Sequence, residues 1–151
     1  MKVILCIQLL FVVHGCSMHQ EEQKLLQGYV QQEFAIEELP HAILVISDEG
    51  CPVCNRAFLD AIGRHTSTRN TLFLVQAVGL SMDMGAFIKE TPNVRFDDGQ
   101  FAQLGILKGS GMILTHNGEV DEVLQISAQG LEGQLHRINH VLDSLAKSET
   151  D

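Results

Sequence analysis

Hydrophobic and polar positions alternate in blocks along the chain, and each block predicts one helix or strand. Residues 42–47 and 71–78 are almost continuously apolar, which is typical of strands buried on both faces of a sheet. Between them, apolar residues recur at helical spacing at Val53, Ala57, Phe58, Ala61 and Ile62. A further short helix is predicted over residues 81–89. Strand, helix and strand in this order predict a parallel pair joined by a right-handed crossover.

The second half of the chain predicts a hairpin and a closing helix. A brief extended piece (93–96) and a short helix (99–104) come first. Residues 111–115 and 119–126 then flank His116-Asn117-Gly118, and Asn-Gly supplies the positive φ angles of a type I′ turn. The last helix carries one apolar stripe, which should cover one side of the sheet: Leu131, Leu135, Ile138, Leu142 and Leu145.

The N-terminal region predicts a leader followed by a helix. Residues 3–13 are largely apolar and too short to span a bilayer as a helix. They lead into Val13-His14-Gly15-Cys16, which resembles the lipobox of bacterial lipoproteins, although His14 stands where a small or hydroxyl residue is usual. Residues 19–38 then show helical spacing, and we expect Pro40 to end this helix, which is either a packed element or a tether.

These segments predict the organisation of the whole chain. We expect a signal peptide at 1–15, acylation of Cys16, a lipid-anchored tether or N-terminal helix at 16–39, one domain at 40–147 and a tail at 148–151. The protein would then lie outside the cytoplasm, anchored in a membrane. The alternative is an ordinary secretory signal that releases a soluble extracytoplasmic protein. In both cases the domain lies in a compartment where disulfides can persist.

Composition narrows the possible partners. The 151 residues, 45% of them hydrophobic, supply one core, so we expect a single domain and a monomer. A formal net charge of −9 disfavours nucleic acid and leaves open a partner protein or small molecule that carries thiols or a disulfide.

Cys51-Pro52-Val53-Cys54 is the motif with the clearest chemistry, because it joins a buried strand to the start of a helix. Free N–H groups and the helix dipole favour a thiolate there, so Cys51 is the candidate nucleophile. Cys54 lies within disulfide reach of Cys51 but is more shielded, which suits a resolving cysteine. Pro52 is compatible with the first position of a helix.

A metal site or a purely structural disulfide fits the cysteine pair less well. A zinc site needs further ligands, and neither a second cysteine pair nor a nearby histidine pair is present. A purely structural disulfide would close a very short loop and stabilise little. Met82 and Met84 beside a dithiol raise the alternative of a Cu(I)-binding chaperone, although Met84 fits a core position. We therefore predict no metal site and no cofactor, and we interpret four histidines as surface residues: His65, His116, His136 and His140.

The order strand, Cys-x-x-Cys helix, strand, helix, hairpin, helix resembles the thioredoxin-like fold over residues 40–147. It is most similar to the membrane-anchored extracytoplasmic thiol–disulfide oxidoreductases related to cytochrome c maturation and peroxiredoxin-type domains. The stretch that begins Pro92-Asn93-Val94-Arg95-Phe96 and continues into the hairpin adds to this likeness. The resemblance implies an α/β fold with a central mixed sheet flanked by helices, and disulfide exchange through Cys51 and Cys54.

Two features depart from that family. Its cis-proline loop, which faces the cysteines, is replaced by Gly109-Ser110-Gly111, and its tryptophan before the first cysteine is replaced by Gly50. We take these residues, with Pro52 and Val53, as the flank of the candidate site. The missing proline favours a second hypothesis, in which the protein is a lipoprotein that uses a thioredoxin-like scaffold for interaction without catalysis.

Overall fold

The computed structural model describes residues 15–76, 87 and 91–148, with side chains from residue 20 onward. A five-stranded sheet forms its centre, in the order β3-β2-β1-β4-β5. The strands are β1 (Ala42–Ile46), β2 (Thr71–Gln76), β3 (Val94–Asp97), β4 (Gly111–His116) and β5 (Glu119–Gln125). Around the sheet lie α1 (Gly15–Phe34), α2 (Pro52–Ile62), the 3₁₀ turn η1 (Gly63–His65), α3 (Gln100–Gln103) and α4 (Leu131–Ser148). In the described ranges, no helix is both long and apolar enough to cross a bilayer.

Strand pairing confirms the predicted fold class. β1 runs parallel to β2 and antiparallel to β4, and β2 runs parallel to β3. The sheet is therefore mixed, with the predicted parallel pair at its centre, and the architecture is that of a thioredoxin-like α/β fold. Of the helix predicted over residues 81–89, only Phe87 is described, and it is buried in the core cluster. The last two residues of the predicted strand 71–78 lie outside the described residues.

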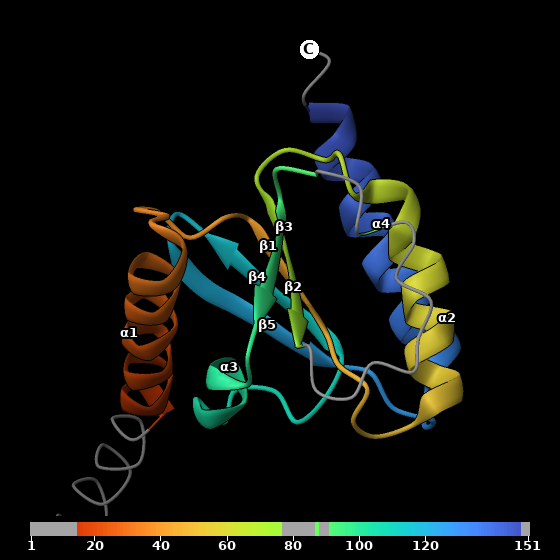
Figure 1. Cartoon of the computed structure of the whole chain (residues 1–151), viewed down its shortest axis with the longest axis horizontal. Helices are drawn as coiled ribbons and strands as arrows, with labels where there is room; N and C mark the ends of the chain where they lie inside the picture. Colours follow the sequence, from red (N-terminus) through yellow and green to blue (C-terminus); the bar gives the residue numbers. More distant parts are fainter. Residues whose placement is uncertain (1–14, 77–86, 88–90, 149–151) are drawn as a thin grey trace, which may run out of the picture.

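Helices cover both faces of the sheet (Figure 1). Successive side chains of a strand point to opposite faces, so Leu44 joins α2 and α4 in one apolar cluster while Ile43 joins α1 and α3 in the other. All five residues of β1 are buried as a result. This double burial explains why the strand is continuously apolar instead of alternating.

The hairpin forms as predicted. Asn117 and Gly118 connect β4 to β5 with φ angles of 52° and 78°, the positive values that a type I′ turn requires. The register shifts between Leu114, which pairs with Glu122, and Thr115, which pairs with Val120. One additional residue therefore lies in β5 and forms a bulge.

Helix α1 packs on the sheet but ends earlier than predicted. It stops at Phe34, whereas the sequence predicted a helix to residue 38 that Pro40 would end. Ala35 adopts a φ of 55° and its N–H donates to the Gln31 carbonyl, which closes the helix with a left-handed residue. Leu26, Tyr29 and Val30 are buried in the cluster on this face.

A buried hydrogen bond joins α1 to the far edge of the sheet. The Tyr29 hydroxyl donates to Asp97 Oδ1 at 2.7 Å. The same carboxylate accepts from the backbone N–H groups of Gly99 and Phe101. Burial, together with the bond to Asp97, raises the pKa of Tyr29 above its usual value, so the hydroxyl stays protonated and remains a donor.

Candidate functional site

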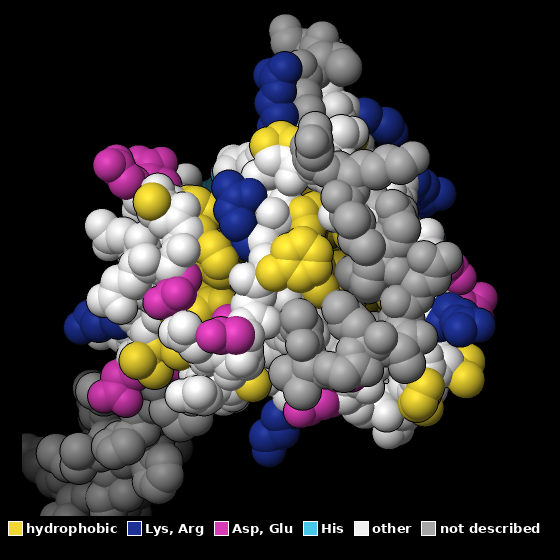
Figure 2. Space-filling view, viewed as in Figure 1, with side chains coloured by type: hydrophobic (Ala, Val, Ile, Leu, Met, Phe, Trp, Pro, Cys, Tyr) yellow, Lys and Arg dark blue, Asp and Glu magenta, His cyan; other side chains and the backbone are white. Residues whose placement is uncertain are grey.

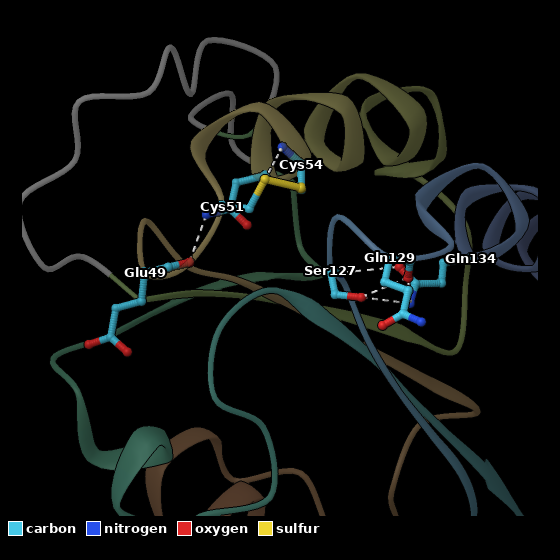
Figure 3. Close-up of a disulfide and its surroundings, with 7 residues drawn as sticks. Glu49, Cys51, Cys54, Ser127, Gln129 and Gln134 are labelled. Atoms are coloured by element: carbon cyan, nitrogen blue, oxygen red, sulfur yellow. Dashed lines mark hydrogen bonds between the residues drawn. A yellow bond between two sulfur atoms is a disulfide. The ribbon is translucent and has the colours of Figure 1, made fainter.

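The two central cysteines form a disulfide at the start of α2. Cys51 is the N-cap residue, with an extended backbone, and its sulfur is bonded to that of Cys54 at 2.08 Å. The backbone N–H of Cys54 also donates to Cys51 Sγ at 3.3 Å. Pro52 occupies the first turn of the helix, where its missing N–H leaves no bond unmade. The sulfur of Cys51 therefore lies at the start of the helix, where it accepts from one helix N–H (Figure 3).

The two sulfurs differ in exposure. Cys54 is 2% exposed and belongs to the core cluster beneath α2, whereas Cys51 is half-buried at the edge of that cluster. Pro52 and Val53, between them, are exposed, and apolar side chains reach the surface at this end of α2 (Figure 2). A partner can thus approach Cys51 more easily than Cys54.

The structure corrects the predicted position of Val53. The helical spacing placed it on the inner face of the helix, but it is 75% exposed. The helix is rotated so that Cys54, Phe58 and Ile62, each four residues apart, face the core. Val53 lies one position before this stripe and points away from it.

Gly50 gives the chain the turn that leads into Cys51. Its φ is 89°, a value that residues with a side chain rarely adopt. A Cβ at this position would meet nothing within 4 Å, so conformation, not space, favours glycine here. This backbone geometry gives a physical reason for the absence of the expected tryptophan.

Gly109, Ser110 and Gly111 lie against the segment that leads from β1 to the disulfide. The Ser110 hydroxyl accepts from the Ser47 N–H and donates to the Ser47 carbonyl, both at 3.0 Å. A Cβ on Gly109 would lie 3.4 Å from the Glu49 carbonyl oxygen. A Cβ on Gly111 would approach the Leu124 carbonyl oxygen within 2.4 Å, so only glycine fits between β4 and β5 there.

Asn55 is a site residue that the sequence did not reveal. Its side chain is 3% exposed, and Nδ2 donates to the Glu49 carbonyl at 2.8 Å. Its backbone N–H donates to the Cys51 carbonyl at 2.9 Å. A polar residue next to Cys54, on the inner side of an amphipathic helix, was the signal that could have identified it.

The loop between β5 and α4 lies near the disulfide (Figure 3). Gln134 folds back over this loop: its Oε1 accepts from the Ser127 N–H at 3.1 Å, and its Nε2 donates to Ser127 Oγ at 3.2 Å. Ser127 Oγ donates in turn to the Gln129 carbonyl at 2.9 Å. These bonds fix the loop locally at the start of α4.

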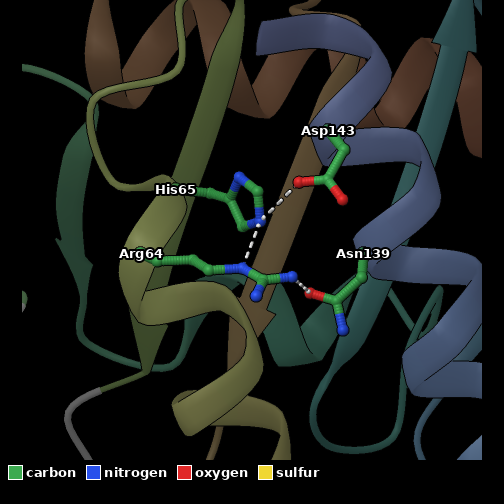
Figure 4. A network of polar contacts seen from close by, with 4 residues as sticks. All are labelled: Arg64, His65, Asn139 and Asp143. Atoms are coloured by element: carbon green, nitrogen blue, oxygen red, sulfur yellow. Dashed lines mark hydrogen bonds and ion pairs between the residues drawn. The ribbon is translucent and has the colours of Figure 1, made fainter.

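His65 is buried, so its interpretation as a surface histidine was wrong. It is 6% exposed, and Nε2 accepts from Arg64 Nε at 3.0 Å and lies 3.6 Å from Asp143 Oδ1 (Figure 4). Arg64 also donates to Asn139 Oδ1 at 2.8 Å, so the network joins η1 to α4. Burial and the Arg64 charge lower the pKa of His65, while Asp143 opposes that shift. The other three histidines interpreted as surface residues are exposed: His116, His136 and His140.

The metal hypotheses find no support in the described part of the chain, which contains no group of three or more His, Cys, Asp or Glu residues placed to hold an ion. Met82 and Met84, on which the copper alternative rests, lie outside the described residues. Cys16, the predicted lipidation site, lies in the first turn of α1.

Comparisons with known proteins leave the site to be interpreted from its own chemistry. The chain matches no protein-family model, no curated protein and no solved structure.

Proposed function

We propose that the protein is a thiol–disulfide oxidoreductase, or redox carrier, that works through Cys51 and Cys54. The observation that carries this proposal is a disulfide at a helix start whose first sulfur is half-buried and whose second is 2% exposed. Such an arrangement is compatible with redox activity because one sulfur is accessible to a partner while the other is held close behind it.

The steps follow from this geometry. In the reduced protein, the Cys51 thiolate attacks a partner disulfide, forms a mixed disulfide and releases one partner thiolate. The Cys54 thiolate then attacks Cys51 Sγ, re-forms the internal disulfide and releases the second partner thiolate. The protein loses two electrons and the partner gains two, and the reverse sequence oxidises a partner dithiol. The Cys54 N–H that bonds Cys51 Sγ would stabilise the attacking thiolate.

We further propose that the protein is an extracytoplasmic lipoprotein, anchored through Cys16, whose partners are proteins with accessible thiols or disulfides. The lipobox-like Val13-His14-Gly15-Cys16 and the apolar leader support the anchor. Pro52 and Val53 are exposed beside the disulfide, so the surface of a partner protein can approach Cys51 there.

Trapping of partners by single cysteine variants tests the proposed exchange. Cys54→Ser should accumulate covalent adducts through Cys51, because the resolving thiol is gone and the mixed disulfide cannot be released. Cys51→Ser should accumulate few, because the remaining sulfur is buried. The measurement is a non-reducing gel with mass spectrometry, after each variant is mixed with extracytoplasmic proteins.

The double variant Cys51→Ser/Cys54→Ser is the matched control and reports adducts formed through Cys6 or Cys16. Equal trapping by both single variants would contradict the assigned roles. If neither single variant traps more protein than the control, the redox proposal is overturned. The result would then favour the hypothesis that the protein is an interaction scaffold without catalysis.

A further inference from the structure

A chain of hydrogen bonds connects the start of β4 to the disulfide helix. The Ser110 hydroxyl bonds both backbone groups of Ser47, Ser47 Oγ accepts from the Glu49 N–H at 3.1 Å, and the Glu49 carbonyl accepts from Asn55 Nδ2. The bonds therefore hold the segment 47–50 from both sides: Ser110, just before β4, holds Ser47, and Asn55 on α2 holds Glu49. Figure 3 shows how closely Glu49 precedes the cysteine pair.

The side chains at the two ends of this chain are shielded from water. Ser110 is 2% exposed and Asn55 is 3% exposed, and Ser47 between them is 1% exposed. A buried polar group that loses its partner pays the full cost of desolvation, so these bonds are strongly maintained. Neither Ser47 nor Glu49 can move away from its partner without breaking one of them.

Cys51 needs such support, because the helix holds it from one side only, through the Asn55 N–H on its carbonyl and the Cys54 N–H on its Sγ. Cys54 is anchored by core packing, but Cys51 is the N-cap residue, outside the regular helix and half-buried. The preceding residue, Gly50, has open space around its Cα and a backbone that other residues rarely adopt. Without the bonds at Glu49, Cys51 could turn about this glycine when the disulfide is open.

We propose that Asn55 and Ser110 are positioning residues that hold the segment 47–50, and so keep Cys51 beside Cys54 in the reduced protein. This inference deepens the proposed function and rests on it for its biological meaning. The physical effect is a high effective concentration of one thiol toward the other, which favours the internal disulfide over two separate thiols.

The redox equilibrium with glutathione tests the inference. One protein disulfide and two glutathione thiols give one protein dithiol and one glutathione disulfide, so the reciprocal of this equilibrium constant measures the effective concentration. Asn55→Ala and Ser110→Ala in the full-length chain should each shift this constant toward the dithiol by roughly threefold to tenfold, the range for one buried hydrogen bond. The readout is the mass of the alkylated peptide that carries both cysteines.

Two matched variants remove similar bonds elsewhere in the fold. Asn93→Ala deletes an Asn Nδ2 bond to the Thr68 carbonyl at 2.7 Å, and Thr115→Val deletes a buried hydroxyl bond to the Pro40 carbonyl at 2.7 Å. Both should lower stability without moving the glutathione equilibrium. A loss of stability alone therefore cannot imitate the expected result.

An unchanged equilibrium in Ser110→Ala would overturn the inference, and so would an equal shift in Thr115→Val. If Asn55→Ala does not fold, as shown by the absence of cooperative unfolding, the comparison of Ser110→Ala with Thr115→Val still tests the inference. The result is separate from the proposed function, because the equilibrium with glutathione is measurable even if no partner protein is trapped.

Discussion

At the scale of single residues, His65 carries a testable dependence on pH. Its pKa is lowered by burial and by the Arg64 charge, so the unfolded chain binds this proton more readily than the folded protein does. The folded state is therefore most stable above the pKa that His65 has in the unfolded chain. The free energy of unfolding decreases as the pH falls from that pKa toward the lower pKa of the folded protein. The wild type should lose stability between about pH 7 and pH 5.

The variant His65→Gln isolates this contribution. Glutamine does not titrate, and its oxygen can accept the hydrogen bond that Arg64 donates at 3.0 Å. Urea unfolding at both ends of the pH range should show a smaller acid-induced fall in midpoint for the variant than for the wild type. The same fall in both proteins would show that His65 does not contribute.

The role of a residue could be predicted where it depends on neighbours in the sequence. It could not be predicted where it depends on contacts that form only in the folded protein. Cys51 and Cys54 were found because a strand-to-helix junction is visible in the sequence as an apolar run followed by an amphipathic one. Asn55 and His65 were missed because their roles depend on partners elsewhere in the chain: Glu49 across a turn and Asp143 on another helix. Spacing alone does not specify such contacts.

At the scale of elements, α1 is an integral part of the packed structure. Leu26 is 0% exposed on its inner face, while the adjacent Leu25 is 52% exposed. Leu26→Ala should lower the free energy of unfolding by roughly 2–5 kcal/mol, the usual cost of truncating a buried leucine. Leu25→Ala, the matched control, should change it by less than about 0.5 kcal/mol.

Chemical denaturation of both variants measures this difference. Equal, small effects would mean that α1 acts only as a tether, which was one of the two alternatives for this helix. The sequence left the alternatives open because an amphipathic stripe shows that one face can be buried, and does not identify what buries it. The end of the helix was misplaced for a similar reason, since Ala35 gives no sign of its left-handed backbone.

At the scale of the whole molecule, the open prediction is the lipid anchor. Mass spectrometry of the membrane fraction should find a mature protein that begins at Cys16 and carries acyl chains. Cys16→Ser should abolish the modification and leave residues 1–15 uncleaved. Cys6→Ser removes the other leader cysteine as a control and should change neither. An unmodified protein in the soluble fraction would contradict the proposed anchor.

The direction of α1 determines which end of the molecule such an anchor would hold. The first turns of α1 and α2 lie at the same end of the sheet, because β1 returns the chain between them (Figure 1). An acyl chain on Cys16 would therefore turn the cysteine end of the fold toward the lipid surface. Encounters would then be confined to a thin layer above the bilayer, where diffusion is two-dimensional, and partners in that same layer would be reached before those in bulk solution.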